Sequence, residues 1–492
     1  MKKILIGTLA LITISVWAED PVKPKASKSR AKKPNLLVIM CDDLGYADVS
    51  FNVQKGAKAK ISTPNIDRIA KAGVRFTSGY VGYSVCGPSR AAFMTGRYGQ
   101  RFGFERNPQY RTQDPNMGLP KEERTFGEML KPVGYISGVV GKWHLGAHKS
   151  NHPLTRGFDY FYGHLGGGHQ YMPNMLTLKD SHAAKNESES YRTWILKNHT
   201  AVPPRKYLTE EFSEAAVEFV TANQKKPFFL FLSYNAPHSP LQATEKYLKR
   251  FPKLSGKRKT YAAMVSCVDD GVGELLNKLD ELKLTENTII FFLSDNGGPE
   301  KKNGSDNGVL RGGKGDSWEG GFRVPFAVQW KGVIPAGKTY DKSVSSLDIM
   351  GTISDLAGVK ADPERPLDGV NLIPYLTGKN DGTPHEAIYL RKFDGGKYTV
   401  RSGEYKLHVS NKGDGSQLYD LDKDIGEAKN IASQHPDEVK KLEALRVKWD
   451  SELVEPRFLG LVHTPEWQAK IKRRKEAEKR KKKRRKRQNE YT

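Results

Sequence analysis

The sequence predicts an α/β fold in which helices cover both faces of a mostly parallel β-sheet, followed by a smaller C-terminal antiparallel sheet with a helix. Continuous apolar runs, typical of buried central strands, recur through the first 380 residues. Segments with helical apolar spacing separate these runs. Beyond residue 380 the runs become short and alternate with Gly, Asn and Asp, as in an antiparallel meander. A chain of 492 residues is long enough for both parts.

The strands expected in the larger part are apolar on both faces. Residues 35–40 read Asn-Leu-Leu-Val-Ile-Met, and residues 227–232 and 288–293 form two further runs rich in Phe, Leu and Ile. Another strand is expected from about Gly134 to Lys142. Such runs favour the centre of a parallel sheet, and a polar residue follows the carboxyl end of each one.

Helices are expected between these strands and again near the C-terminus. Thr63 and Pro64 are typical of a helix start, and this helix should end at Gly73. Residues 261–282 repeat apolar side chains every three or four positions and predict one long helix. The C-terminal part is predicted to contain short strands starting near Ala387, Tyr398, Tyr405 and Gln417, and a helix from about Pro436 to Leu453.

The N-terminus has the pattern of a secretory signal peptide over residues 1–18. Two lysines precede an apolar run from Ile4 to Val16, and small residues precede a cleavage site before Glu19. The run is too short to span a membrane, so we expect a periplasmic or secreted protein without a transmembrane segment. The predicted organisation continues with a basic linker at 19–33, a larger N-terminal domain at 34–380, a C-terminal subdomain at 381–468 and a basic tail at 469–492.

The net charge of +24 is concentrated at the two ends of the chain, since residues 1–33 carry +6 and residues 469–492 carry +11. The tail is expected to be helical or disordered, and either solvated or attached weakly to a polyanion such as an acidic polysaccharide. An exported protein seldom meets nucleic acid, so that partner is not expected. Three cysteines cannot form a disulfide framework, and Cys41 and Cys267 are expected to be buried thiols.

The most informative motif is Cys86-Gly87-Pro88-Ser89-Arg90, which is closed by Thr95-Gly96-Arg97. Pro88 suits the first turn of a helix, where backbone N–H groups and a partial positive charge favour an anion. Arg90, one turn further on, keeps its charge and can bind an anionic oxygen. On these residues alone, a loop-to-helix junction with a buried thiol remains an alternative.

Oxygen donors follow two of the predicted strands. Asp42 and Asp43 come directly after the first strand, and Asp295 and Asn296 after the strand at 288–293. Ligands of α/β proteins commonly bind beyond the carboxyl edge of the sheet. A set of metal donors made only of oxygens suits a hard cation such as calcium. A single Asp-Asp pair would more commonly be a helix cap or a turn.

Basic residues follow the other strands. Lys142 and His144 lie two residues apart, so on an extended segment their side chains would face the same way. His238 follows the Phe-rich strand, and Lys314 lies in the glycine-rich run 312–315, which lacks the pattern of a phosphate-binding loop.

The Cys-x-Pro-Ser-Arg motif with Thr-Gly-Arg, the Gly-Lys-Trp-His-x-Gly run at 141–146 and the paired aspartates together resemble the type I sulfatases. The likeness is to bacterial polysaccharide sulfatases such as carrageenan sulfatases, and it covers nearly the whole mature chain. It implies an alkaline-phosphatase-like fold in which a separate maturation enzyme oxidises Cys86 to formylglycine. One hydroxyl of the hydrated aldehyde then attacks sulfur, and the other later expels sulfate.

The same resemblance assigns roles to individual side chains. Arg90 and Lys142 would hold the hydrated aldehyde and the sulfate, and His144 would remove the proton that lets the covalent sulfo-enzyme collapse. His238 would donate a proton to the departing alcohol, and Lys314 would bind a sulfate or leaving-group oxygen. The resemblance implies one calcium ion, with the ligands Asp42, Asp43, Cys86, Asp295 and Asn296.

The substrate expected from this resemblance is a sulfated poly- or oligosaccharide, possible examples being carrageenans. His164 and His169 in a glycine-rich loop, and the basic residues Arg97 and Arg311, are candidate substrate contacts. Three alternatives remain at this point: an arylsulfatase of small substrates, a phosphatase or phosphodiesterase of the wider superfamily, and a catalytically silent polyanion-binding protein. The sequence does not indicate an oligomeric state.

Overall fold

A computed structural model describes residues 33–53, 60–360, 362–410 and 415–469, together with 471–473, 476 and 480. The predicted signal peptide, and nearly all of the basic linker and the basic tail, lie outside the described residues. From Lys33 onwards the chain forms one compact unit, and the predicted division at residue 380 remains a prediction. Within the described ranges, no helix is both long and apolar enough to cross a membrane.

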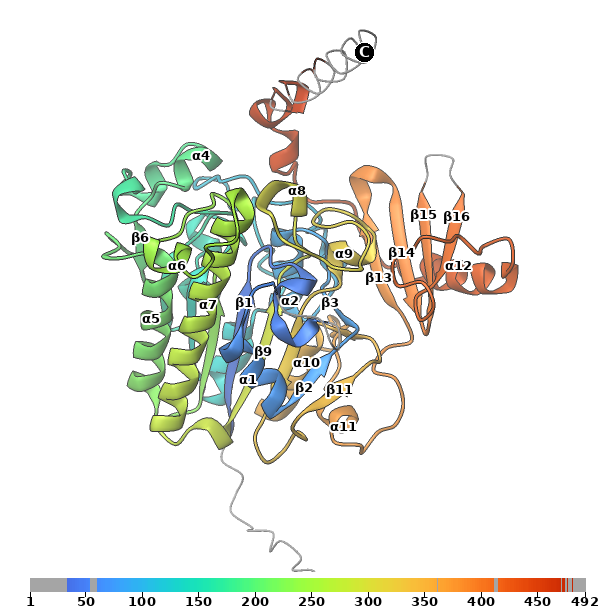
Figure 1. The fold of residues 1–492 in the computed structure, drawn as a ribbon, viewed down its shortest axis with the longest axis horizontal. Helices are drawn as coiled ribbons and strands as arrows, with labels where there is room; N and C mark the ends of the chain where they lie inside the picture. Colours follow the sequence, from blue (N-terminus) through green and yellow to red (C-terminus); the bar gives the residue numbers. More distant parts are fainter. Residues whose placement is uncertain are drawn as a thin grey trace, which may run out of the picture. The chain divides into compact units, whose positions relative to one another are not determined.

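The larger part is built on a ten-stranded sheet with the order β11-β2-β10-β9-β1-β8-β4-β5-β6-β7 (Figure 1). The central five strands are parallel: β9 (Thr288–Ser294), β1 (Asn35–Cys41), β8 (Phe228–Ser233), β4 (Ile136–Lys142) and β5 (Tyr160–His164). Antiparallel pairings attach β10 (Phe326–Gln329) on one side and β6 (Ile195–Lys197) and β7 (Thr200–Val202) on the other; beyond β10 lie β2 (Val74–Phe76) and β11 (Lys338–Tyr340). The four predicted apolar runs are therefore the centre of a mostly parallel sheet, as expected.

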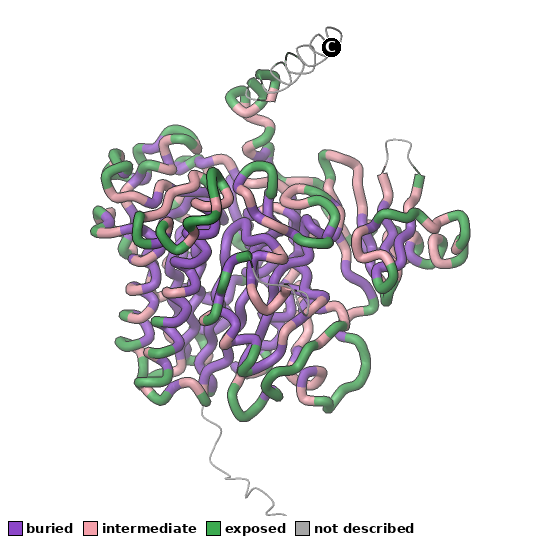
Figure 2. The backbone as a smooth tube through the Cα atoms, in the orientation of Figure 1, coloured by how far each residue is buried: buried purple, intermediate pink, exposed green. Residues whose placement is uncertain are grey.

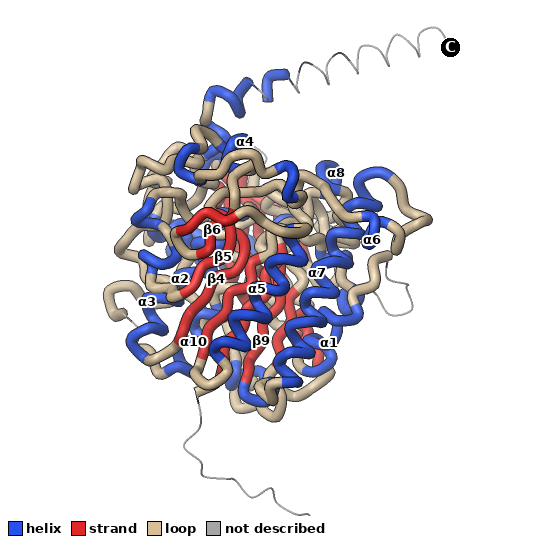
Figure 3. The backbone as a smooth tube through the Cα atoms, turned by 90° about the vertical axis from the view of Figure 1, so that its left-hand side faces the viewer, coloured by secondary structure: helices blue, strands red, loops and turns tan. Residues whose placement is uncertain are grey.

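Helices cover both faces of this sheet because alternate residues of its strands face opposite sides. In β1, Leu36 and Val38 belong to one buried apolar cluster, and Leu37 and Ile39 belong to the other. The first cluster includes side chains of α2 (Cys86–Thr95), α3 (Phe126–Leu130) and α10 (Asp348–Ala357). The second includes side chains of α1 (Pro64–Ala72), α5 (Leu208–Asn223) and α7 (Gly256–Glu281), and Figure 3 shows the sheet between the two helical layers.

The smaller part is the predicted antiparallel meander with one helix. Its four strands are β13 (Ile388–Lys392), β14 (Lys397–Ser402), β15 (Tyr405–Ser410) and β16 (Ser416–Asp420), paired in chain order. Helix α12 (Pro436–Asp450) packs on them through Leu442, which shares a buried cluster with Leu407 and Leu418. Figure 2 shows this small core apart from the larger buried interior.

Two helix boundaries differ from the predicted ones. Helix α7 begins at Gly256, five residues before the predicted start at Tyr261. The prediction missed its first turn because those residues are too polar to show apolar spacing. Helix α12 ends at Asp450 rather than Leu453. The remaining elements are a two-stranded sheet of β3 (Gly79–Tyr80) and β12 (Val344–Ser345), and the short helices α4 (Glu187–Ser190), α6 (Glu245–Leu248), α8 (Glu300–Asn303), α9 (Glu319–Phe322) and α11 (Ile373–Leu376).

Candidate active site

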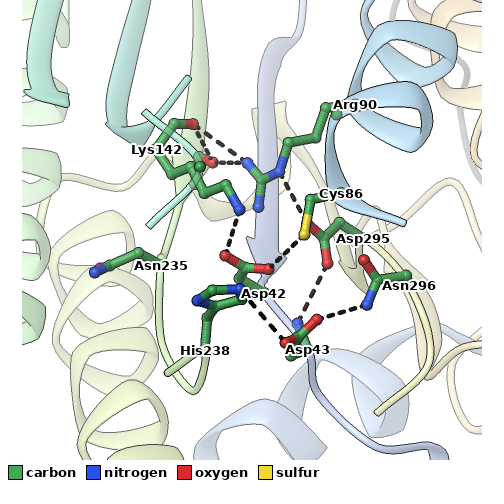
Figure 4. Close-up of polar contacts among 12 residues, drawn as sticks. Asp42, Asp43, Cys86, Arg90, Lys142, Asn235, His238, Asp295 and Asn296 are labelled. Atoms are coloured by element: carbon green, nitrogen blue, oxygen red, sulfur yellow. Dashed lines mark hydrogen bonds and ion pairs between the residues drawn. The ribbon is translucent and has the colours of Figure 1, made fainter. Parts of the chain in front are cut away.

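A cluster of buried polar side chains lies at the carboxyl ends of the central parallel strands (Figure 4). Asp42 and Asp43 follow β1, and Asp295 and Asn296 follow the neighbouring β9, so the sheet brings the four oxygen-bearing side chains together. The backbone supports this, since Asp295 N donates to Cys41 O and Asp43 N to Asp295 Oδ1, at 2.9 and 3.3 Å.

Cys86 reaches this cluster from the first residue of α2, as the motif predicted for a helix start with Pro88 in the first turn. Its Sγ lies 3.3 Å from Asp42 Oδ1, and Lys314 Nζ lies 2.9 Å from the same sulfur. The thiol is 2% exposed, and burial together with the Asp42 charge raises its pKa well above the ordinary value. Lys314 comes from the glycine-rich loop, so two distant segments meet at Cys86.

Each of the three buried carboxylates is paired with a basic side chain. The pairs are Lys142 with Asp42 at 2.6 Å, Lys314 with Asp43 at 2.6 Å, and Arg90 with Asp295 at 2.9 Å. Burial opposes ionisation of Asp43, but the charges of Lys314 and His238 outweigh it and lower its pKa to about 2. Burial and the Asp42 charge raise the pKa of Asp295 to about 6 despite Arg90. The six side chains together carry no net charge when all are ionised, so an added divalent cation would make the site attractive to an anion.

Arg90 is fixed by groups at the ends of β4 and β8. Its Nη1 donates to Lys142 O at 3.2 Å and to Ser233 Oγ at 2.5 Å, while Ser233 Oγ donates to Lys142 O at 2.7 Å. Gly141 allows these two strands to approach: its φ is 110°, and a Cβ there would lie 1.9 Å from Ser233 O. The Arg90 guanidinium is therefore held rigidly at the ends of β4 and β8.

His144 reaches the site by a route different from the predicted one. Strand β4 ends at Lys142, and His144 has a φ of 60°, so the segment is not extended and the argument from alternation was wrong. A left-handed conformation is uncommon for a residue other than glycine, and such residues cluster at functional sites. Burial and the charges of Lys142 and Arg90 lower its pKa, so the imidazole is neutral and can accept a proton.

His238 lies beside Asp43, on the loop after β8. Its Nε2 lies 3.7 Å from Asp43 Oδ2, and its Nδ1 lies 2.6 Å from Ser239 O. A backbone carbonyl beside Nδ1 selects the tautomer with the proton on Nδ1, which leaves Nε2 as the free nitrogen. Burial and the Lys314 charge lower the pKa of this histidine to about 3.

The oxygen donors of the cluster suit a hard divalent cation. The ligand atoms of Asp42, Asp43, Cys86 and His238 all lie within 4.8 Å of one another. Asn296 donates from Nδ2 to Asp43 Oδ1 at 2.7 Å, and its carbonyl Oδ1 is buried without a hydrogen-bond partner among the described residues. An oxygen left unsatisfied beside two carboxylates is a suitable calcium ligand.

Asp295, also predicted as a ligand, has both carboxylate oxygens engaged, as Asp42 has. One of its oxygens accepts from Asp43 N at 3.3 Å and the other accepts from Arg90 Nε at 2.9 Å. His238, whose implied role is proton donation, also stands inside the group of candidate ligands. The predicted ligand set therefore remains a prediction, with His238 an additional neighbour.

Sequence reasoning did not single out Asn235, which follows β8 and lies beside the cluster in Figure 4. Both polar atoms of its side chain are buried and have no partner within the described ranges. Buried amides are normally hydrogen-bonded, so this one is available to a ligand. A polar residue at the end of a buried strand was the available signal, the same one that identified Asp42.

The candidate substrate contacts are dispersed. His164 ends β5 beside Lys142, and its two ring nitrogens are buried without partners among described residues, whereas His169 binds the Gln170 carbonyl through Nδ1 at 2.9 Å. Arg97, beyond the far end of α2, lies 3.2 Å from Glu123. Arg311 stacks on Trp318 of the larger part and donates to Glu427 O of the C-terminal part. Of the four candidates, the structure brings His164 beside Lys142 and His169 against His164, with ring centroids 4.7 Å apart.

Two sequence-family models match the chain. The model described as sulfatase matches residues 34–359, which is about two thirds of the sequence. The model described as N-sulphoglucosamine sulphohydrolase, C-terminal, matches residues 314–451 and so covers the meander and α12.

Similar proteins extend this result. An arylsulfatase of Hemicentrotus pulcherrimus is 32% identical over 82% of this chain and 75% of its own length, and the N-acetylgalactosamine-6-sulfatase of Canis lupus familiaris is 34% identical over 76% and 71%. The crystal structure of Ps i-CgsB in complex with k-i-k-neocarrahexaose is 38% identical, covers 86% of this chain and 94% of that one, and has a TM-score of 0.79. These likenesses also place the fold among the alkaline-phosphatase-like enzymes, as expected. The chain belongs to the sulfatase family and is a sulfuric ester hydrolase.

Proposed function

We propose that this sulfatase removes sulfate from a sulfated oligo- or polysaccharide of the carrageenan type and that Cys86 must first be oxidised to formylglycine. The observation that carries the reaction is the position of Cys86: it opens a helix, lies 3.3 Å from Asp42 and is contacted by Lys314. The helix N-terminus and nearby basic residues favour an anionic group at this position.

Individual residues of the chain would attack sulfur, bind the sulfate and transfer protons. When oxidised and hydrated, residue 86 would supply the hydroxyl that attacks sulfur. Lys142 and Lys314, held by Asp42 and Asp43, would bind the sulfate oxygens from two sides. His144 is neutral and could accept a proton near residue 86.

His238 would protonate the departing alcohol, but this role requires an imidazolium. Its pKa of about 3 means that the ring is neutral before substrate binds. A sulfate ester beside the ring would raise this pKa, because negative charge favours the protonated form. Substrate binding would thus prepare His238 for proton donation.

The carrageenan assignment rests on Ps i-CgsB, which is bound to a neocarrahexaose and resembles this chain along nearly its whole length. Aryl sulfates are the second candidate substrates, because a curated relative is an arylsulfatase. A phosphoesterase is disfavoured by Cys86, since phosphoesterases of this superfamily typically use Ser or Thr at the corresponding position. We further propose export by the signal peptide and maturation by a formylglycine-generating enzyme.

Calcium would be held by Asp42, Asp43 and Asn296 beside residue 86 and would add positive charge next to the bound sulfate. Removal of calcium with EGTA is expected to lower sulfate release by about tenfold or more, because the otherwise neutral cluster then loses the positive charge beside the bound sulfate ester. Added calcium should restore activity, and magnesium should restore less because it demands a tighter octahedral geometry. Full activity after exhaustive chelation would contradict this part of the proposal.

The proposed function is tested by sulfate release from a substrate panel after co-expression with a formylglycine-generating enzyme. The panel contains carrageenan oligosaccharides, other sulfated glycans, 4-nitrophenyl sulfate and 4-nitrophenyl phosphate. Sulfate release from a carrageenan oligosaccharide is the expected result. Release only from 4-nitrophenyl sulfate would overturn the saccharide assignment, and preferential hydrolysis of the phosphate would overturn the assignment to sulfate esters.

A further inference from the structure

The chain after α12 returns to the larger part of the molecule. We call residues 454–468 the C-terminal strap; they belong to the predicted C-terminal subdomain at 381–468. The strap pairs with the segment after α2, since Val454 N donates to Gln100 O at 3.1 Å and Arg457 N to Gly103 O at 2.9 Å. The end of the strap is drawn in red at the top of Figure 1.

Asn107 ties the strap to the residue next to Cys86. Its backbone O accepts a hydrogen bond from Leu461 N at 2.9 Å, and its side-chain Oδ1 accepts one from Gly87 N at 2.8 Å. Arg106 Nη1 and Gln109 Nε2 add bonds to the carbonyls of Phe458 and Leu459, at 2.9 and 2.7 Å. The strap is thus anchored at the start of the helix that carries the nucleophile.

Between the strap and the larger part lies a cavity of about 670 Å³. Its walls come from three segments: residues 109–111, residues 185–191 and the strap from Leu461 to Trp467. The side chains that matter for binding are Tyr110, Tyr191 and Trp467, which are aromatic, and Arg111 and Lys185, which are cationic. A second hollow of about 640 Å³ has residues 109–111 and Lys185 in common with this cavity, so the two spaces lie on either side of these residues.

The cavity begins close to the catalytic groups. Glu187, in its wall, accepts a hydrogen bond from Gly167 N at 3.2 Å. A Cβ on Gly167 would lie 2.7 Å from His144 Nε2 and 2.9 Å from Glu187 Oε1, so one glycine separates the cavity wall from His144. Tyr191 similarly stands against Gly168, where a Cβ would lie 2.5 Å from its hydroxyl oxygen.

The cavity carries two carboxylates, Glu187 and Glu466, beside the cations Arg111 and Lys185, so it suits a sugar chain whose sulfate groups lie at the two cations. Ligand cavities of 300–1,000 Å³ are typically lined by aromatic side chains with a few polar groups, and flat aromatic rings offer contact area at low entropic cost. Arg111 donates only to Gln109 Oε1, and neither Arg111 nor Lys185 has a carboxylate partner in the part of the chain that the structure describes. Both cations are available to sulfate groups of neighbouring sugar units.

We propose that this cavity is the saccharide subsite of the enzyme and that the strap, through Trp467, closes it over the sugar chain that carries the reacting sulfate. This inference rests on the proposed function, and it names the part of the chain that would select glycans as substrates. Trp467 lies outside the catalytic cluster and acts on the substrate away from the reacting ester.

The test compares Trp467→Ala and Arg111→Ala with the wild type on k-i-k-neocarrahexaose and 4-nitrophenyl sulfate. For each variant the measured quantity is the ratio of kcat/KM for the hexasaccharide to kcat/KM for the aryl sulfate. Because both substrates use the same active enzyme, incomplete folding or maturation cancels in this ratio. The ratio is expected to fall by about tenfold in each variant, with the change in KM rather than kcat.

Val462→Ala is the matched control, because Val462 is an exposed strap residue, 39% accessible, that does not line the cavity. Its ratio should equal that of the wild type. Unchanged ratios in both Trp467→Ala and Arg111→Ala, with a wild type that cleaves the hexasaccharide, would overturn the subsite alone. A wild type that cleaves only the aryl sulfate would overturn the proposed substrate and the subsite together.

Discussion

Replacement of Cys86 by alanine is expected to lower sulfate release by a factor on the order of 10⁴ or more. Alanine removes the sulfur and with it the atom that maturation replaces by an aldehyde oxygen. Every other group of the site would remain, including the Lys142–Asp42 and Lys314–Asp43 pairs, so substrate should still bind. The measurement is kcat for 4-nitrophenyl sulfate, with substrate binding to the variant measured by calorimetry.

Cys267→Ala is the matched control for this prediction. Cys267 is a buried free thiol of α7 and is packed on the opposite face of the sheet from α2. Its replacement should leave kcat unchanged. A Cys86→Ala enzyme that retained more than a few per cent of the wild-type kcat would contradict a nucleophile derived from residue 86.

Replacement of Lys406 by alanine is expected to lower the free energy of unfolding by about 3–5 kcal/mol. Lys406 Nζ lies 2.9 Å from Glu319 and 2.7 Å from Glu427, and all three side chains are fully buried. Removing the ammonium leaves two carboxylates without this partner in a low-dielectric interior. The measurement is the midpoint and slope of unfolding in denaturant.

The stability lost in Lys406→Ala should depend on pH. Burial opposes ionisation of Glu319, but the charges of Lys406, Arg323 and Arg401 together outweigh it and lower its pKa to about 2, below that of the unfolded chain. In the wild type, this pairing therefore stabilises the protein above about pH 4.5 and loses its effect as pH falls towards 2. Without Lys406 the carboxyl groups are easier to protonate, so the difference between variant and wild type should shrink from pH 8 to pH 5.

Lys423→Ala is the control for Lys406, because Lys423 also contacts a carboxylate, Asp420, but its side chain is 85% exposed. Its replacement should change stability little at either pH. A Lys406→Ala protein as stable as the wild type at pH 8 would show that the buried cluster does not hold the meander to the larger part.

Further contacts link the C-terminal part to the loop that carries Lys314. Glu319 begins α9, a few residues after the loop that carries Lys314. In that loop Ser317 Oγ lies 2.7 Å from His408 Nε2, and Ser317 O accepts from Thr399 Oγ1 at 3.1 Å. The meander thus supports the loop that places Lys314 against Cys86.

Much of the fold was predictable because its strands are apolar on both faces. Residues 35–40 and 288–293 could hardly be anything but central strands, and their carboxyl ends then had to bring Asp42 and Asp295 together. The antiparallel flanks were not predictable, because strands such as β6 and β11 have only three residues each. The start of α7 was not predictable either, because its first residues are too polar to show the apolar spacing of a helix.

The cluster itself was predicted from motifs, but the way each residue reaches it was not. His144 depends on a left-handed backbone that spacing cannot reveal. Ser233 and Asn235 follow from the position of β8 beside β4, which requires the sheet order. The strap was missed because its role depends on contacts with residues more than 300 positions earlier in the chain.

Whether catalysis uses an oxidised Cys86 is tested most directly by mass spectrometry of the peptide containing residue 86. The peptide is isolated from several preparations of the active enzyme, made with different amounts of the maturation enzyme, and kcat is measured for each. We expect an aldehyde at residue 86 whose fraction is proportional to kcat. High activity in a preparation that carries only the unmodified thiol would contradict it.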